Sequence, residues 1–312
     1  MKSFPTPIVV VSKCLGFGVC RYDGERIDNP FLRHLRQHVR FLTVCPEVEI
    51  GLGVPRDPID IVLAGGYKML CQLATGRNLT RRMAGFSRRF LDSLDKVDGF
   101  VLKRNSPSCG ICGAKILASA DVNAKVIRQD TGFFAAHVLE RFGALAVEDD
   151  RRLEDSRIRH HWLTKLFTLA AFHTARRLVS MKKLAKFHAQ NRLLLTAYNQ
   201  KQTRALDRII CNQGKRPADE VAAEYETHLW LALRRPARLA SNIRILTLAL
   251  DHFSRHLSRS EKASFLRSLK RYREHGTPLS AILKTVGVWA VRYDKTYVKD
   301  QTFFRPYPGE FL

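Results

Sequence analysis

Short β-branched runs alternate with helix-like segments through the first half of the chain. Ile8–Val11 is the first run, a helix-like stretch covers 30–39, and Phe41–Val44 is the second run. Gly99–Lys103 is a third. Strands that alternate with helices follow a βαβ order, whose usual outcome is a parallel sheet. We therefore expect an α/β fold with a parallel sheet in the N-terminal half.

Further segments of this half carry weaker patterns. Periodicity predicts helices over Ile61–Leu73, Leu79–Leu94 and Phe133–Phe142, and a strand over Lys115–Leu117.

The pattern changes near residue 155 to long segments with a helical period near 3.6. Ser258 and Glu261 have the spacing of a capping box, which predicts the start of a helix that runs to His275. We expect an all-α C-terminal domain over 156–312 after an α/β domain over 1–155.

Positive charge is concentrated in the second half of the chain. Residues 1–150 hold 21 Lys/Arg and 16 Asp/Glu, a net charge of +5, whereas 151–312 hold 32 and 13, a net charge of +19. Such a field attracts RNA or another polyanion over the distance that ionic screening allows. The basic half therefore predicts a polyanionic partner.

Composition and cysteine usage point to the cytoplasm. The chain has 312 residues, 45% of them hydrophobic, and no apolar run approaches the roughly 20 residues of a membrane helix. Seven cysteines are an odd number in a long chain, which favours reduced thiols or metal ligation over a disulfide framework. We expect a cytoplasmic protein with no membrane association.

Three cysteines, Cys14, Cys45 and Cys109, each lie just beyond one of the apolar runs. If those runs are parallel strands, the thiols meet at one edge of the sheet, where such sheets bind ligands. Thiolates ligate zinc and iron–sulfur clusters, so the pattern is compatible with a metal site, and ordinary buried core is the other interpretation. Cys112 lies three residues after Cys109 and is a candidate fourth ligand, which would close the site. For the remaining cysteines, core positions are the preferred interpretation: Cys20, Cys71 and Cys211.

Three polar residues stand close to these cysteines in the sequence. Glu47 comes two residues after Cys45, where a carboxylate can act as a general base. Ser106 and Ser108 flank Pro107 just before Cys109, where hydroxyls can orient a substrate or cap the next segment. As isolated residues they more often serve as surface or capping groups.

Four ordered motifs resemble the bacterial thiouracil desulfidase (TudS) family over roughly residues 5–155. They are VVVSKCLGFGVCRYDG, CPEVEIGLGVPRDP, LKRNSPSCG and TGFFAAHVLERFG. The resemblance implies a Rossmann-like domain that holds a 4Fe–4S cluster through only three cysteines and removes sulfur from thiolated uracil as hydrosulfide. By motif, it implies Cys14, Cys45 and Cys109 as ligands, with Glu47 and Ser106 as catalytic residues.

The first half departs from the family pattern at two positions, and the second half resembles another family. Lys13 stands where the family usually has a small residue, and Cys112 adds a thiol to the loop after the third strand. Residues 160–312 resemble the helical YbgA-like domain of unknown function that is often fused to this desulfidase domain.

The resemblance leads to a functional hypothesis. The substrate is a thiolated pyrimidine (thiouracil, thiouridine or a tRNA-derived thionucleotide), its sulfur binds the iron that lacks a cysteine, and water replaces it. Ser108 and Arg56 are candidate substrate-binding residues, with a structural salt bridge as the alternative role of Arg56. The alternative function is a nucleic-acid-binding protein whose iron–sulfur or zinc site is only structural.

Overall fold

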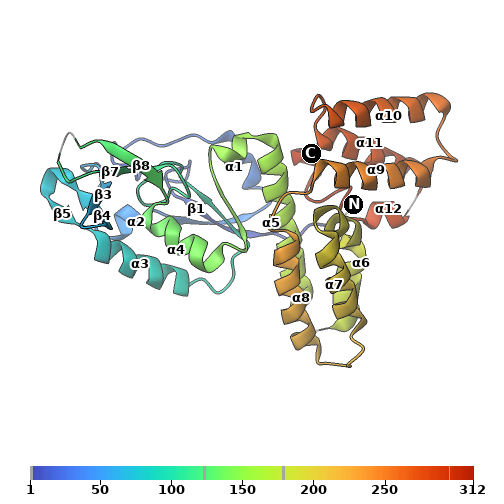
Figure 1. The fold of residues 1–312 in the computed structure, drawn as a ribbon, viewed down its shortest axis with the longest axis horizontal. Helices are drawn as coiled ribbons and strands as arrows, with labels where there is room; N and C mark the ends of the chain where they lie inside the picture. Colours follow the sequence, from blue (N-terminus) through green and yellow to red (C-terminus); the bar gives the residue numbers. More distant parts are fainter. Residues whose placement is uncertain (1–2, 122–123, 178–179, 295) are drawn as a thin grey trace. The chain divides into compact units, whose positions relative to one another are not determined.

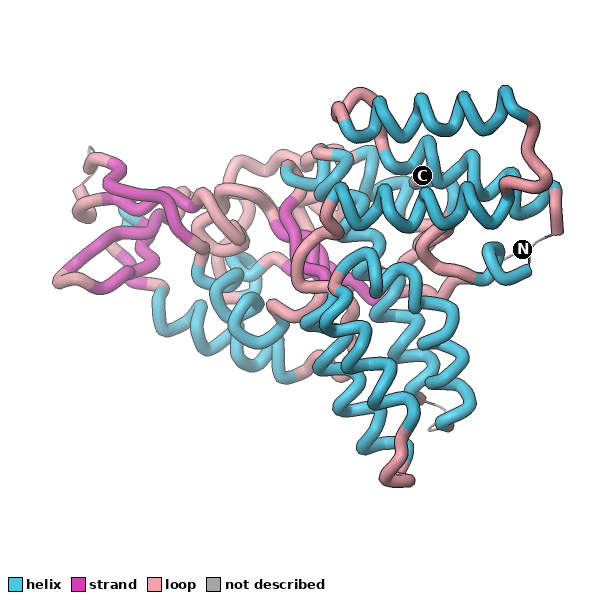
Figure 2. Tube along the Cα trace, turned by 45° about the vertical axis from the view of Figure 1, so that its right-hand side comes forward, coloured by secondary structure: helices cyan, strands magenta, loops and turns pink. Residues whose placement is uncertain are grey.

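The computed structural model describes residues 3–121, 124–177, 180–294 and 296–312. The chain forms two compact units. One is Thr6–Asp155; the other is Ser156–Leu312 together with residues 3–5. Phe4 belongs to the second unit because its ring packs edge-on against Phe167 at a centroid distance of 5.9 Å. Figure 2 shows the strands gathered in the first unit.

A four-stranded parallel sheet runs through the first unit in the order β2-β1-β6-β9. Val9, Val10 and Val11 of the inner strand are completely buried, as expected for a parallel strand covered on both faces. The predicted α/β class with a parallel sheet is confirmed. The strands are β1 (Ile8–Ser12), β2 (Arg40–Val44), β6 (Gly99–Leu102) and β9 (Ala146–Asp149).

A second, mixed sheet was not expected from the sequence. Its order is β5-β4-β3-β7-β8, and β7 contains the expected strand Lys115–Leu117. The helix predicted over Ile61–Leu73 was wrong, because this segment forms the β3–β4 hairpin. Gly65 and Gly66 join the two strands with φ of 57° and 81°, values that a two-residue hairpin turn requires and that glycine adopts readily. The strands are β3 (Asp60–Ala64), β4 (Tyr67–Gln72), β5 (Arg77–Asn78), β7 (Ala114–Leu117) and β8 (Val126–Asp130).

Helices α3 (Thr80–Asp92) and α4 (Phe133–Phe142) lie side by side in the first unit (Figure 1). Phe134 of α4 packs against Phe86 and Phe90 of α3, with ring centroids 6.2 and 5.9 Å away. Both helices were predicted from the sequence. The shorter helices α1 (Pro30–Leu35) and α2 (Pro46–Glu49) follow the first and second strands.

The described part of the second unit is helical. Phe172 stacks on Tyr225 at 5.5 Å in one part of its core, and Phe253 packs against Trp289 at 5.8 Å in another. The predicted capping box at Ser258 is present. The helices are α5 (Ser156–Arg176), α6 (Met181–Tyr198), α7 (Gln200–Cys211), α8 (Ala218–Ala232), α9 (Leu239–Phe253), α10 (Arg259–Arg273), α11 (Leu279–Arg292) and α12 (Thr296–Asp300).

Within the described ranges, none of the helices combines the length and the apolar character that crossing a membrane requires.

Candidate active site

Strands β2, β1 and β6 are neighbours, and each is followed by a segment that carries a cysteine. Ser12 at the end of β1 is in register with Val44 at the end of β2, and β6 pairs with the opposite side of β1. Cys14 follows β1, Cys45 directly follows β2, and Cys109 lies in the loop after β6. The strand order reverses at β1, and open α/β sheets bind ligands at the carboxyl ends of strands at such a point.

The thiols of these segments meet. Cys20 hydrogen-bonds with the thiols of both Cys14 and Cys45. Cys109 lies close to Cys45 and Cys20, and its thiol hydrogen-bonds with the hydroxyl of Ser12. Cys20, Cys45 and Cys109 are buried, whereas Cys14 is partly exposed. The structure therefore brings the three predicted ligands together in a set that is open to solvent on the side of Cys14.

The chemistry of these donors fits a soft metal centre. The hydrogen bond with Cys14 raises the pKa of Cys20 to about 11. The hydrogen bond with Cys20, together with burial, raises the pKa of Cys45, and burial raises the pKa of Cys109. Several thiols crowded in a buried place are costly to ionise unless a cation compensates their charge, and metal ligation does this as it displaces their protons. The residues present thus fit an iron–sulfur cluster.

The other cysteines correct the sequence interpretation in two places. Cys20 is buried, at 2% exposure, but it belongs to the thiol set and not to the plain core. Cys211 was expected in the core and is exposed at the end of α7, whereas Cys71 is buried in β4 as expected. Cys112 is exposed, and its Sγ lies 3.8 Å from a carboxylate oxygen of Asp149 at the end of β9. Among the described thiols, Cys20 contacts two of the predicted ligands, Cys14 and Cys45. Cys20 is therefore a better candidate than Cys112 for a fourth cluster ligand.

Glu47 is held beside this set by an ion pair with Arg56. Nε and Nη2 of Arg56 donate to the same carboxylate oxygen, Oε2, at 3.2 and 2.5 Å. Nη1 donates to the backbone carbonyls of Cys20 at 3.1 Å and Gly53 at 3.0 Å. Both side chains are largely buried, with exposed fractions of 15% for Glu47 and 5% for Arg56. Oε1 of Glu47 accepts no hydrogen bond from the described residues, so it is the oxygen available to a ligand.

The two serines play different local roles. The Ser106 hydroxyl accepts hydrogen bonds from the backbone N–H of Ser108 at 3.2 Å and of Cys109 at 3.0 Å, which fixes the turn that carries this cysteine. Its own proton has no acceptor among the described residues. Ser108 is completely buried, and its Oγ has no hydrogen-bond partner in the described chain. Buried hydroxyls are nearly always paired, so a bound ligand is a reasonable partner for this one.

The serine–cysteine loop is anchored on the N-terminus of α4. The backbone N–H groups of Phe133 and Ala135 donate to the carbonyls of Pro107 at 2.9 Å and Ser108 at 3.0 Å. These are helix N–H groups that have no partner inside the helix. The motif TGFFAAHVLERFG therefore positions the motif SPSCG through main-chain bonds.

Lys13 contributes a positive charge at this edge of the sheet. Its charge favours the ionised form of the Cys20 thiol, although the pKa of Cys20 stays raised. Its aliphatic stem lies over Gly18, where an added Cβ would come within 2.7 Å of Lys13 Cε. The departure from the family pattern at Lys13 thus places a cation beside the thiol set.

Two separate segments of the chain match known protein families. Residues 9–150 match the family model described as 2-thiouracil desulfurase, and residues 192–308 match a family of unknown function, DUF1722. The chain therefore carries a segment that matches the 2-thiouracil desulfurase family, called the desulfurase domain below, followed by a segment that matches DUF1722. This confirms the fusion that the sequence motifs predicted. Each matched segment falls within one of the two compact units.

Two proteins are similar to the desulfurase domain. The uncharacterized protein YbbK of Bacillus subtilis (strain 168) is 29% identical over 137 residues, which are 39% of this chain and 90% of YbbK. The solved structure of the 4Fe–4S-dependent thiouracil desulfidase TudS is 26% identical, and the match covers 48% of this chain and 95% of TudS with a TM-score of 0.37.

Cys20, Ser12 and the contacts of Arg56 are the site features that sequence reasoning missed. The sequence signal for Cys20 was its place six residues after Cys14 in the same loop. In the structure, a hydrogen bond from the Ile27 N–H to the Cys14 carbonyl, at 3.0 Å, closes that loop. The thiol set, the Glu47–Arg56 pair and the two serines all lie within the matched residues 9–150.

Proposed function

We propose that the desulfurase domain holds a 4Fe–4S cluster through Cys14, Cys45 and Cys109 and replaces the sulfur of a thiolated uracil with oxygen from water. The observation that carries the proposal is the meeting of these thiols, from three separate strand ends, beside the Glu47–Arg56 ion pair. The 2-thiouracil desulfurase family match supports the reaction class. Such a cluster contains four irons, so three cysteine ligands leave one iron without a cysteine.

When bound, the cluster supplies an iron without a cysteine ligand, a soft Lewis acid for the thiocarbonyl sulfur of the substrate. Oε1 of Glu47 accepts the proton of the water that attacks the thiocarbonyl carbon. Arg56 acts as a positioning residue, since Nε and both terminal nitrogens are engaged by protein groups and it fixes Oε2 of Glu47.

The serines orient the substrate in this scheme. Ser106 donates its free hydroxyl proton to the pyrimidine or relays a proton to the leaving sulfur, and the unpaired hydroxyl of Ser108 binds a polar edge of the base. A C–O bond forms and the C–S bond breaks, sulfur leaves as hydrosulfide with its electron pair, and water supplies the oxygen and the protons. No electrons are transferred overall.

The substrate class is a thiolated uracil as free base, as nucleoside or within a tRNA-derived nucleotide. The test is anaerobic cluster reconstitution, iron and sulfide counting, and incubation with 2-thiouracil, 4-thiouracil, 4-thiouridine and thiolated tRNA. We expect the oxygen analogue of the substrate (uracil, uridine or tRNA with uridine in place of the thiolated base) and hydrosulfide in equal amounts from at least one of them, and no product from Cys14→Ala. Cys211→Ala is the matched control, because this cysteine is exposed and lies outside the thiol set. A protein with a full cluster that releases no sulfide from any of the four, or an active Cys14→Ala variant, would refute the proposal.

A further inference from the structure

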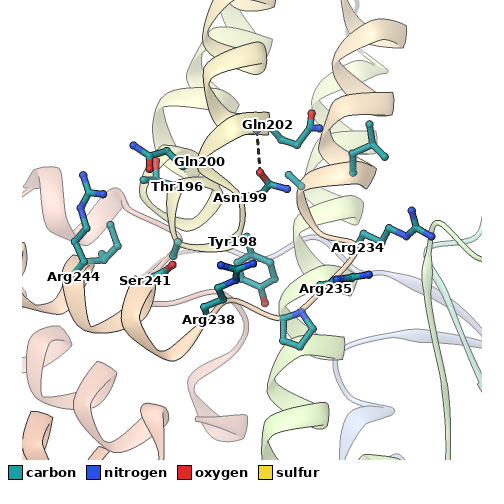
Figure 3. A pocket seen from close by; sticks show the side chains of 15 residues that line it. Thr196, Tyr198, Asn199, Gln200, Gln202, Arg234, Arg235, Arg238, Ser241 and Arg244 are labelled. Atoms are coloured by element: carbon teal, nitrogen blue, oxygen red, sulfur yellow. Dashed lines mark hydrogen bonds between the residues drawn. The ribbon is translucent and has the colours of Figure 1, made fainter. Parts of the chain in front are cut away.

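The second unit contains a cavity of about 810 Å³ (Figure 3). Its walls come from the turn between α6 and α7, around Tyr198 and Asn199, and from the loop between α8 and α9 with the first turns of α9. This volume lies within the range of roughly 300–1,000 Å³ of small-molecule sites. The residues that line it lie within the segment that matches DUF1722, a family of unknown function.

Four arginines dominate one wall of this cavity: Arg234, Arg235, Arg238 and Arg244. All four are exposed, and Figure 3 shows Arg234, Arg235 and Arg238 following one another along the α8–α9 loop. No aspartate or glutamate lines the cavity. None of the four side chains forms a hydrogen bond or ion pair with another described residue. Other arginines of this unit, such as Arg192 with Asp207, are paired with carboxylates.

Like charges gathered around a concave surface repel one another and concentrate anions from solution. The planar guanidinium fork matches the oxygens of a phosphate group and binds it through two parallel hydrogen bonds. Four unpaired guanidiniums match an anion with more than one phosphate better than they match a single carboxylate.

The remaining walls suit the rest of a nucleotide. Asn199 accepts a hydrogen bond from the backbone N–H of Gln202 at 3.2 Å through its side-chain oxygen, so its amide nitrogen stays available as a donor. Leu231, Pro236 and Ile245 add apolar lining, which suits a sugar or base. The first turn of α9 contains no acidic residue, and no side chain caps it. Its unpaired N–H groups therefore add to the positive potential.

We propose that this cavity is a binding site for consecutive phosphate groups of a nucleotide. The ligand chemistry, two or more phosphates carried by a nucleoside, has two sources: a free nucleoside polyphosphate and an RNA strand. The site lies wholly in the helical unit, so the proposal stands apart from the desulfurase reaction.

The test is equilibrium binding to the full chain of three probes: pyrophosphate, ATP and a fluorescent single-stranded RNA 12-mer. The variant is Arg235→Gln with Arg238→Gln. The control is Arg267→Gln with Arg271→Gln. Both arginines are exposed on α10 and form no ion pair with another described residue, so the double substitution removes the same charge outside the cavity. Thermal unfolding checks that both variants are folded, and release of sulfide from free thiouracil checks the first domain independently.

We expect the cavity variant to bind at least one probe tenfold or more weakly, and the control to stay within about threefold. Loss for pyrophosphate and ATP identifies a free polyphosphate as the source. Loss for RNA alone, with a slope of log K against log salt that is smaller by about 0.7 per phosphate contact removed, identifies the RNA strand. Absence of binding of all three probes to the unmodified chain, or equal losses in the two variants, overturns the proposal.

Discussion

Replacement of Gly132 by alanine tests whether α4 positions the loop that carries Cys109. A Cβ at Gly132 would lie 2.7 Å from the carbonyl oxygen of Ser108 and 2.8 Å from those of Pro107 and Ser106. Ordinary contact begins near 3.4 Å, so the loop must retreat by roughly 0.7 Å. The obstructing atoms are backbone, so no side-chain rotation relieves the clash. Gly132 has φ of −67°, and the effect is therefore one of space and not of backbone conformation.

The cost follows from the main-chain bonds that this movement weakens. The N–H groups of Gly132, Phe133 and Ala135 donate to loop carbonyls at 2.8, 2.9 and 3.0 Å. Each such bond contributes about 1 kcal/mol net, so loss of two or three costs about 2–3 kcal/mol. At about 2–4 °C per kcal/mol, the unfolding temperature of the desulfurase domain falls by about 4–12 °C. Because Cys109 moves with the loop, iron content falls as well.

The assay is thermal unfolding of the cluster-free chain, followed by iron counting after anaerobic reconstitution. Gly85→Ala in α3 is the matched control, because its added Cβ meets only the flexible end of Arg89 at 3.4 Å. Alanine in a helix interior is expected to leave stability unchanged or raise it by about 0.5–1 kcal/mol. A Gly132→Ala protein with unchanged unfolding temperature and iron content would refute the argument that this contact positions the loop.

Three further predictions address the cluster, the base and a buried charge. Cys20→Ser should keep the iron content of the unmodified protein whereas Cys14→Ser loses it; loss in both would mean that Cys20 is a ligand and that no iron is left open. Glu47→Gln should lower the rate of sulfide release by about 10²–10⁴ at unchanged iron content, and a decrease below threefold would remove Glu47 as the base. Lys165→Met should stabilise the chain by up to about 3 kcal/mol at pH 7, because burial lowers the pKa of Lys165 to about 8 and so makes its charged form costly. The unfolded chain keeps the proton of Lys165 to about pH 10, so the stability of the unmodified protein should rise between about pH 8 and 10. The advantage of the Lys165→Met variant should shrink over the same range. A difference in unfolding temperature that does not change with pH would contradict this.

The parallel sheet and the gathering of the cysteines could be predicted because both follow from local pattern and general topology. β-branched runs such as Ile8–Val11 identify buried strands, and parallel strands place their carboxyl ends at one edge. The hairpin over Asp60–Gln72 was missed because a short apolar run has no clear period. Its decisive signal was the Gly65–Gly66 pair, which favours a hairpin turn.

The contacts of the site could not be predicted, because they join segments whose relative placement is set by tertiary structure. Arg56 lies nine residues from Glu47, and only the folded loop aims its guanidinium at that carboxylate. The arginine cavity is a similar case. The sequence reveals a basic half, but the unpaired state of Arg235 and Arg238 depends on the distance of every carboxylate in the folded unit.

Arg56 links the two features on which the proposed reaction depends. Nε and Nη2 of Arg56 donate to one carboxylate oxygen of Glu47, and Nη1 donates to the backbone carbonyl of Cys20. The same carbonyl also accepts a hydrogen bond from the Cys45 thiol at 3.5 Å. The orientation of the base and the position of the extra thiol are therefore coupled through one side chain. A lysine has a single nitrogen and cannot make these contacts at once. In the proposed reaction, an open iron therefore requires that Cys20, whose thiol lies beside those of Cys14 and Cys45, does not itself bind the cluster.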